Sequence, residues 1–443
     1  MYIPHSQQDI EFLLKECGLK NRDEIFKHIP YYDKYKIDSI NIPKLSEKEI
    51  LEYFQECAKA NIDMQNKKIF LGGGVYYHYI PSVVDYLSAR GEFVTSYTPY
   101  QPEASQGSLQ AFYDFQTLIG RLTGYKAVTL GHYDGATALS EIIAIFARLK
   151  ETDTIALSPF LNPYVKNVVK TYTGILRLNT IELPQSARYT VDINALNEFI
   201  EKNRTKILVV QQPNFYGFLE DTKAVAEIAK KRNVLSVYFS LEPTHLGLFR
   251  CPGELGYDIT VLEGQPLGIY PNFGGPLLGI IASKEEYLRY LPGRLVGKTY
   301  DAENKVAYTL TLQTREQHIR REKSFSNICT NQGVLAIRVA IYLASLGFEG
   351  LRKIASICYD YAHYAYENIL KNANIRKMSD ADFYNEFTIK TLFDPQQLNN
   401  KLIAKNMVGG LSIKNGNDYI YIVALTELLD KKSIDEFINT LLD

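Results

Sequence analysis

Residues 207–239 read ILVVQQPNFYGFLEDTKAVAEIAKKRNVLSVYF, and this stretch decides the fold class. The apolar runs 207–210 and 234–239 have the length and composition of buried strands. Between them, 221–232 carries apolar residues at helical spacing behind an aspartate that can cap a helix. Two buried strands joined by a helix form the repeating unit of a parallel sheet, so we expect an α/β protein.

The same alternation extends in both directions. The pattern predicts helices over 108–122, 136–149, 163–172 and 192–202, and strands over 127–130, 154–157, 175–181, 259–262 and 277–282. Ligands of such sheets gather at the carboxyl ends of strands. We therefore expect the functional residues in the loops that follow the strands.

The two ends of the chain read differently. Ser6 precedes an apolar helical pattern, and Ser46 with Glu49 forms a capping box before a second one. Two such helices have no core of their own, so their apolar stripe must cover another surface. Towards the C-terminus we expect helices over 332–346, 350–370, 395–405 and 433–442, and strands over 387–392 and 419–424. The predicted parts are a helical arm (1–65), a large α/β domain (66–329) and a small α/β domain (330–443).

Composition excludes several classes of function. Lys+Arg 49 against Asp+Glu 50 leaves no positive field for nucleic acid or an anionic membrane. We see no secretory signal at the N-terminus and no apolar run of membrane-spanning length. The five cysteines include no C-x-x-C pair, and the histidines show no metal-ligand spacing. We expect a cytoplasmic enzyme or enzyme subunit without a metal site.

Four segments could carry chemistry, and each has a structural alternative. Residues 95–107, TSYTPYQPEASQG, form a rigid polar segment or a surface loop. Residues 131–138, GHYDGATA, follow a strand and suit a phosphate cradle or a plain β–α turn. The basic side chains of residues 315–331, REQHIRREKSFSNICTN, could bind an anion or could simply form the solvated face of a helix. Cys329 in this segment is expected to be buried. Residues 263–279, EGQPLGIYPNFGGPLLG, are rich in glycine, which lets the backbone come close to another group. That group could be a ligand, or the segment could be a structural crossover between strands.

Together these segments resemble the glycine cleavage system P-protein family. The likeness is closest to the separate N-terminal-half subunit of its two-chain form. It includes IPHSQQDI, FLGGGVYYHYIPSVVDYL, SYTPYQPEASQGSLQAF, YDGATAL, QPNFYGFLED, EGQPLG, NFGGPLLG, PGRLVG, REQHIRREKSFSNICTNQ and LGFEGLR, in order along nearly the whole chain. The resemblance implies the fold of type I pyridoxal phosphate (PLP) enzymes: a seven-stranded mixed sheet in the large domain and a smaller C-terminal α/β domain.

The resemblance also implies a reaction. The family decarboxylates glycine with PLP and passes the aminomethyl group to the lipoyl arm of H-protein. That chemistry needs a lysine to hold PLP as a Schiff base. Gln265 stands at the equivalent position, and the next lysine, Lys284, lies beyond the following strand. Glu242 is a possible remnant of the acid that pairs with the pyridinium nitrogen. An amide forms no Schiff base, so we expect PLP on a lysine-bearing partner, subunit 2, in an α2β2 assembly.

Site residues follow by motif match. The loop 97–107 is expected to reach the partner's PLP site, with Tyr97, Thr98, Tyr100, Gln101 and Glu103 contacting glycine or the cofactor. Further candidates, as a vestigial phosphate site or as interface residues, are Tyr133, Asp134, Gly135, Thr137, Arg320, Arg321 and Asn327. Two alternatives stay open. The chain could be a scaffold that stabilises the partner and docks H-protein, or a stand-alone PLP enzyme, which would need a lysine that the sequence does not offer.

Overall fold

The computed structural model describes residues 5–32, 43–62, 64, 66–272, 274–392, 394–416 and 418–442. The chain divides into two compact units between residues 63 and 64. The second unit, 64–443, is not divided further, so the separation of a small domain at residue 330 stays a prediction.

The N-terminal unit contains α1 (Gln7–Glu16), a 3-10 helix η1 (Arg22–Phe26) and α2 (Glu47–Lys59). Both α-helices begin at a capping box, formed by Ser6 with Asp9 and by the predicted pair Ser46 with Glu49. Neither helix buries any residue, although each carries large apolar side chains. Among the described residues of this unit, the apolar side chains of α1 and α2 are therefore not buried in a core.

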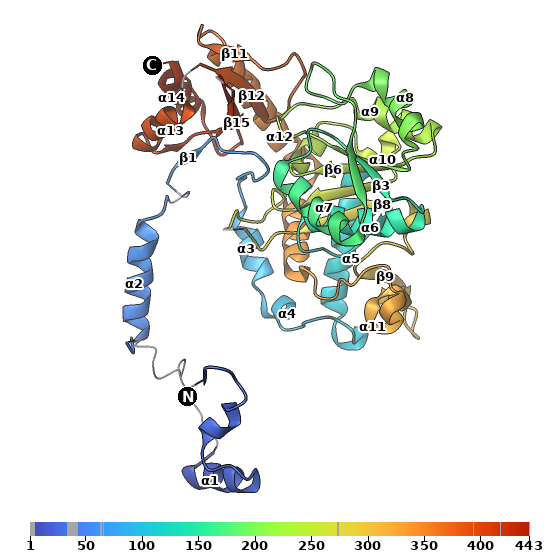
Figure 1. Cartoon of the computed structure of the whole chain (residues 1–443), viewed down its shortest axis with the longest axis vertical. Coiled ribbons are helices and arrows are strands. Elements are labelled where there is room, and N and C mark those ends of the chain that lie inside the picture. Colours follow the sequence, from blue (N-terminus) through green and yellow to red (C-terminus); the bar gives the residue numbers. More distant parts are fainter. Residues whose placement is uncertain are drawn as a thin grey trace. The chain divides into compact units, whose positions relative to one another are not determined.

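A seven-stranded mixed sheet forms the centre of the second unit (Figure 1). Its order is β2 (Ala127–Val128), β8 (Gly279–Ser283), β7 (Ile259–Glu263), β6 (Leu235–Ser240), β5 (Ile207–Gln211), β3 (Thr154–Leu157) and β4 (Asn179–Glu182). The strands from β7 to β4 run parallel, and β8 is antiparallel to both of its neighbours. The carboxyl ends of β3, β5, β6 and β7 therefore share one edge, which we call the carboxyl edge.

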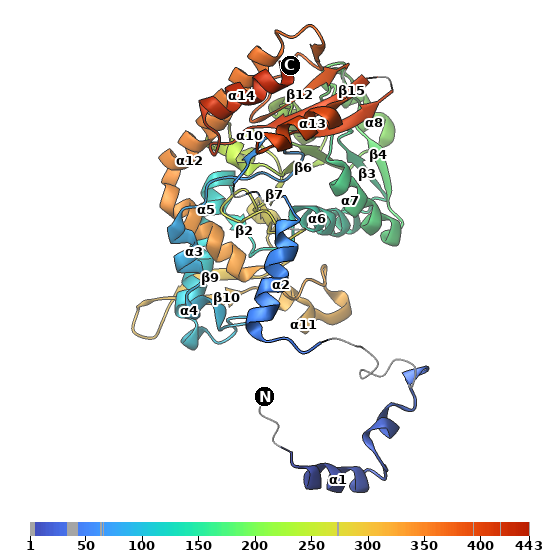
Figure 2. The same ribbon diagram turned by 90° about the vertical axis from the view of Figure 1, so that its left-hand side faces the viewer.

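Helices cover both faces of this sheet because alternate strand residues point to opposite faces. Ile207 and Val209 lie in one apolar cluster with α6 (Gly135–Leu149) and α7 (Pro163–Leu176). Leu208 and Val210 lie in another with α8 (Ile193–Asn203) and α9 (Thr222–Lys231). Near β7 and β8, this second layer continues as α5 (Gln106–Thr123) and α12 (Gly333–Ile369), which pack together (Figure 2).

The small sheet is antiparallel, in the order β11 (Ile375–Lys377), β12 (Glu386–Thr391), β15 (Asp418–Ala424) and β14 (Leu411–Asn415). Helices α13 (Pro395–Ala404) and α14 (Lys431–Leu442) contribute to the core beside it (Figure 1). A short parallel pair, β1 (Lys68–Ile69) with β13 (Met407–Val408), ties the start of this unit to the same region.

The remaining short helices are α3 (Ser82–Ser88), α4 (Gly91–Val94), η4 (Pro102–Ala104), η5 (Pro243–Gly247), α10 (Pro252–Leu255), η6 (Glu285–Tyr287), η7 (Gln313–Arg315), α11 (Gln317–Arg320) and η8 (Arg321–Lys323).

The structure corrects one sequence expectation and adds one element. The apolar run 175–181 is not one strand, because α7 continues to Leu176 and β4 begins at Asn179. The hairpin β9 (Leu295–Tyr300) and β10 (Val306–Thr311) was not predicted. The two helices predicted at 332–346 and 350–370 are confirmed: α12 consists of two helical parts separated by Gly347, whose backbone is not helical (φ 61°, ψ −173°).

Helix α12 also revises the expectation about membranes. By length and composition alone it is apolar enough to cross one. Its buried residues, from Ala336 to Ile369, instead belong to the apolar clusters of the second unit. A kinked helix with one face in a protein core is the simpler interpretation.

Candidate active site

A pocket of about 390 Å³ opens between the predicted loop and the start of α12. Its lining is mixed, with apolar side chains such as Phe112 and Leu130 beside polar ones. The polar lining residues are Thr95, Ser96, Tyr97, Thr98, Arg294, Thr330, Asn331 and Gln332. A hollow in which several polar groups converge on an apolar wall can hold a small polar molecule.

Arg294 is the organising residue of this pocket. It directly precedes β9 and is only 4% exposed. Its Nη1 donates to the carbonyl oxygen of Cys329 (2.5 Å), and its Nη2 donates to the hydroxyl of Tyr100 (3.0 Å). The carboxylate of Glu316 lies 3.7 Å from its Nε, so the buried charge has a counter-ion.

Two segments that the sequence presented separately meet on Arg294. The guanidinium lies 5.5 Å from the ring centroid of Tyr100, and that ring packs edge-on against His318. The hydroxyl of Tyr97 is 2.5 Å from Oγ1 of Thr330. The loop 95–107 and the segment 315–331 therefore build one site.

Sequence reasoning did not single out Arg294. The sequence feature that could have indicated Arg294 is the motif PGRLVG at 292–297, in which the arginine stands between a turn and the start of a strand. Because Arg294 is distant in sequence from both segments that it joins, its role needed the tertiary fold.

The other predicted residues are more dispersed. Tyr100, Gln101 and Glu103 are exposed and do not line the pocket, although Tyr100 reaches its wall through the hydrogen bond from Arg294. Arg320, Arg321 and Asn327 are exposed as well. Cys329, expected to be buried, is exposed, because the irregular segment before α12 turns its carbonyl, not its side chain, to Arg294.

The predicted phosphate cradle is occupied by the chain's own carboxylates. Asp134 caps α6 by accepting from the backbone N–H of Thr137 (2.8 Å), while Tyr133 is partly exposed. Oε2 of the buried Glu263 accepts from the N–H of Gly135 (2.9 Å). Burial raises the pKa of Glu263 to about 7, against the effect of its backbone hydrogen bonds. The amides that would cradle an anion are thus already used.

Gln265 is a buried structural residue. Its Oε1 accepts from the N–H of Tyr76 (3.1 Å), and its Nε2 donates to the carbonyls of Tyr76 (2.8 Å) and Ile269 (2.9 Å). The neighbouring Gly74 has φ 117°, and a Cβ there would lie 2.8 Å from Nδ2 of Asn162. The glycine-rich segment 71–74 is therefore what lets the backbone lie against the carboxyl edge.

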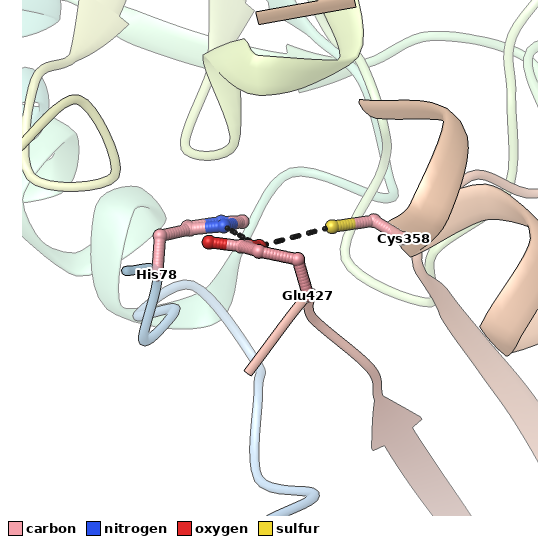
Figure 3. A group of neighbouring side chains, drawn as sticks. All are labelled: His78, Cys358 and Glu427. Atoms are coloured by element: carbon pink, nitrogen blue, oxygen red, sulfur yellow. Dashed lines mark hydrogen bonds and ion pairs between the residues drawn. The ribbon is translucent and has the colours of Figure 1, made fainter. Parts of the chain in front are cut away.

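Beside Gln265, His78 joins two carboxylates. Its Nε2 lies 3.1 Å from Glu242 and its Nδ1 lies 2.8 Å from Glu427 (Figure 3 shows the Glu427 side). Burial alone would lower the pKa of His78, but the two carboxylates outweigh it and raise the pKa well above its usual value. An imidazolium thus pairs with Glu242, the residue predicted as the remnant partner of a pyridinium nitrogen.

His78, Cys358 and Glu427 also lie close enough to bind a metal ion, with donor atoms within 4.8 Å of one another (Figure 3). They come from distant segments, so sequence spacing gave no sign of them. The Cys358 thiol donates to Glu427 (3.4 Å), and burial raises its pKa to about 12, whereas a metal needs the thiolate. We interpret the group as a hydrogen-bonded ion cluster.

Lys284 cannot replace the missing lysine. It follows β8, where the antiparallel register pairs Ser283 with Ile259, the first residue of β7. Gln265 lies beyond the last residue of β7, at the opposite edge of the sheet. Lys284 is bound there to Asp258 (2.6 Å).

The family model for the glycine cleavage system P-protein matches residues 1–441. The chain belongs to the glycine cleavage system P-protein family. It is 41% identical to a probable glycine dehydrogenase (decarboxylating) subunit 1 of Thermomicrobium roseum, covering 100% of this chain and 99% of the relative. It is 39% identical to the corresponding protein of Sulfurisphaera tokodaii, covering 98% and 96%. The chain is thus a subunit of a decarboxylating glycine dehydrogenase, and a subunit 1 implies a subunit 2.

Solved structures agree. The chain resembles an inhibitor-bound crystal structure of glycine decarboxylase (P-protein), with a TM-score of 0.88, 36% identity and coverage of 100% and 99%. A sphingosine-1-phosphate lyase of Burkholderia pseudomallei has a TM-score of 0.67 at 13% identity, covering 93% of each chain, which shows the fold alone. The P-protein chain therefore has the predicted fold of type I PLP-dependent enzymes.

The carboxyl edge of this P-protein chain does not fit PLP. An amide stands where the resemblance places the Schiff-base lysine, and Glu263 occupies the amide of Gly135. Tyr76 and His78 of the same chain lie against Gln265 and Glu242. Protein side chains and backbone thus use the groups that would hold the cofactor.

Proposed function

We propose that this chain completes, without holding PLP, a glycine decarboxylase active site whose cofactor is carried by subunit 2. The closed carboxyl edge supports the first half of the proposal, because its polar groups are bonded within the chain. The open pocket at Arg294 supports the second half, because it presents polar side chains that a partner's site could use. The assembled enzyme would pass the aminomethyl group of glycine to the lipoyl arm of H-protein, as an α2β2 complex.

The hydroxyl of Tyr100 carries the chemical argument. It accepts a hydrogen bond from Arg294 and so keeps its own proton available for an oxygen of glycine. Tyr97 and Thr98 line the pocket itself and add neutral hydroxyls next to it. Neutral donors hold a carboxylate in place more weakly than a guanidinium would, and so oppose the loss of carbon dioxide less. Exclusion of water by a partner covering the pocket would further favour that loss.

On this proposal Arg294 is a positioning residue. Its two Nη groups are engaged with Tyr100 and with the backbone at Cys329. It fixes the hydroxyl of Tyr100 against the segment that leads into α12. Gln101 and Glu103 remain candidate contacts for the partner's site, because both are exposed on the same loop.

The test uses the complex with subunit 2. Tyr97→Phe, Tyr100→Phe and Glu103→Gln are compared with Tyr164→Phe, a control tyrosine that is 76% exposed outside the loop. Assembly is measured by light scattering, and turnover by glycine-dependent exchange of carbon dioxide with H-protein present. Lower turnover in the loop variants, with intact assembly, is expected.

The alternative function is a scaffold that stabilises subunit 2 and docks H-protein. It predicts altered assembly and unchanged turnover per assembled complex. Unchanged turnover in all three loop variants would remove the loop from catalysis.

A further inference from the structure

Three arginines line a second hollow, which shares no lining residue with the pocket at Arg294. Its volume is about 470 Å³, and its lining consists of Arg289, Leu312, Thr314, Arg315 and Arg320. Within the part of the chain that the structure describes, no acidic side chain lines it. Neither the family match nor the relatives assign a role to this hollow.

The positive charge of this arginine hollow is not neutralised by an ion pair. Among the described residues, none of the three arginines has a carboxylate within ion-pair distance. Arg315 donates from Nη1 to the carbonyl of Leu291, but its Nε and Nη2 are buried without an acceptor. Burial lowers the pKa of Arg315 to about 10, and the charge of Glu316 offsets that effect only in part.

Aromatic packing orders part of the hollow. The guanidinium of Arg320 lies 5.6 Å from the ring centroid of Phe325, and that of Arg148 lies 5.5 Å from the same centroid. The ring of Tyr290 packs edge-on against Phe325. Arg320 is therefore held in place before any ligand arrives, which lowers the entropic cost of binding.

We propose that the arginine hollow binds a phosphate-class oxyanion. Guanidinium groups are planar forks that match the oxygens of phosphate, and Thr314 adds a hydroxyl donor. A monocarboxylate offers one negative charge and two oxygens to three cations, whereas a phosphate dianion offers more of both. The ligand can be free inorganic phosphate or the phosphate group of a small ester. This inference is independent of the function proposed for the pocket at Arg294.

The experiment measures binding to the assembled complex by calorimetry at fixed ionic strength. The probes are inorganic phosphate, glycerol 3-phosphate as a monoester, and acetate as a carboxylate. The variants are Arg289→Gln and Arg320→Gln. Lys323→Gln is the control, since Lys323 is an exposed cation of the same segment that does not line the hollow.

We expect saturable phosphate binding. Each arginine variant should weaken this binding by about tenfold or more, because it loses one hydrogen bond to a charged group. The control should bind as the parent does, and acetate should bind far more weakly. Tighter binding of the monoester would identify an ester as the ligand, and equal binding would identify free phosphate. Arg289 is exposed, so its variant keeps the test decisive if Arg320→Gln fails to assemble. No saturable phosphate binding, an equal loss in the control, or competition by acetate as strong as by phosphate would overturn the proposal.

Discussion

Gln265 and Tyr76, 189 residues apart in the sequence, are joined by two hydrogen bonds: the Tyr76 N–H donates to Oε1 of Gln265, and Nε2 of Gln265 donates to the Tyr76 carbonyl. Both residues are buried. The position that would carry a Schiff-base lysine in a PLP-holding chain is therefore a fixed structural contact here. We therefore predict that restoring a lysine at that one position will not restore a cofactor site.

Gln265→Lys should lower the stability of the complex and should not gain PLP. The lysine leaves the Tyr76 N–H without its acceptor, at a cost of roughly 1–3 kcal/mol, and it must also bury an amine. The melting temperature of the complex measures the loss of stability, and the absorbance after incubation with PLP shows whether a Schiff base forms. Gln397→Lys, at an exposed position of α13, is the matched control. A Gln265→Lys chain that forms a stable PLP adduct at an unchanged melting temperature would contradict this account.

Glu386→Gln should flatten part of the dependence of stability on pH. Burial raises the pKa of Glu386 from 4.5 to about 7, so the folded chain favours the protonated acid. That contribution is complete below pH 4.5 and is lost as the pH rises through about 7. A glutamine can still pair with the Gly73 N–H and the Tyr76 hydroxyl, the two partners of Glu386. The variant should therefore gain up to about 3 kcal/mol relative to the parent towards pH 8.

Denaturant unfolding of the complex between pH 5 and 8 measures this difference. Glu367→Gln, on an exposed turn of α12, should keep the parental slope. Some slope should remain in Glu386→Gln, because burial also raises the pKa of Glu220 and Glu263 to about 7. A constant difference between Glu386→Gln and the parent at every pH would show that Glu386 does not titrate in this range.

Arg294→Lys and Tyr100→Phe should each reduce kcat for glycine, and the double variant should do little worse than the more affected single one. Both changes remove the same hydrogen bond between Nη2 and the tyrosine hydroxyl, so their effects should not add. The expected single effect is a loss of about tenfold in kcat and an equal loss in kcat/KM, for a hydrogen bond worth roughly 1.5 kcal/mol. Additive losses in the two-by-two cycle would mean that Arg294 does not act through Tyr100.

Leu51→Ser with Phe54→Ser should weaken association with subunit 2 without unfolding residues 64–443. Both side chains lie on α2, are more than half exposed (55% and 64%), and pack into no core of their own unit. If subunit 2 covers them, losing two buried apolar groups of about 1.5–3 kcal/mol each should weaken binding at least tenfold. Sedimentation at several concentrations measures this, with Glu52→Gln on the same helix as the control. Equal association of both variants would mean that α2 does not contact subunit 2.

Local signals in the sequence predicted most elements of the fold. The helices α6 and α8 begin within one residue of the predicted starts at 136 and 192, and the buried strands appear where apolar runs stood. The hairpin of β9 and β10 was missed, although LVGKTY and VAYTLT flank a polar turn. The run at 175–181 misled because the apolar end of α7 adjoins β4.

The site was less predictable, because it depends on contacts between distant segments. The loop at 97–107 and the segment 315–331 were both recognised by resemblance, but Arg294, which joins them, was not. The ion cluster of His78, Cys358 and Glu427 joins three distant stretches of the chain. No periodicity or spacing could have indicated such a cluster before the sheet set its geometry.

Reduction of the PLP-loaded complex with borohydride, followed by peptide mass spectrometry of both chains, tests the central claim most directly. Reduction fixes the cofactor to whichever lysine holds it. The account predicts a pyridoxyl label on a lysine of subunit 2 and none on this chain. A stoichiometric label on any lysine of this chain, together with glycine decarboxylation by this chain alone, would contradict it.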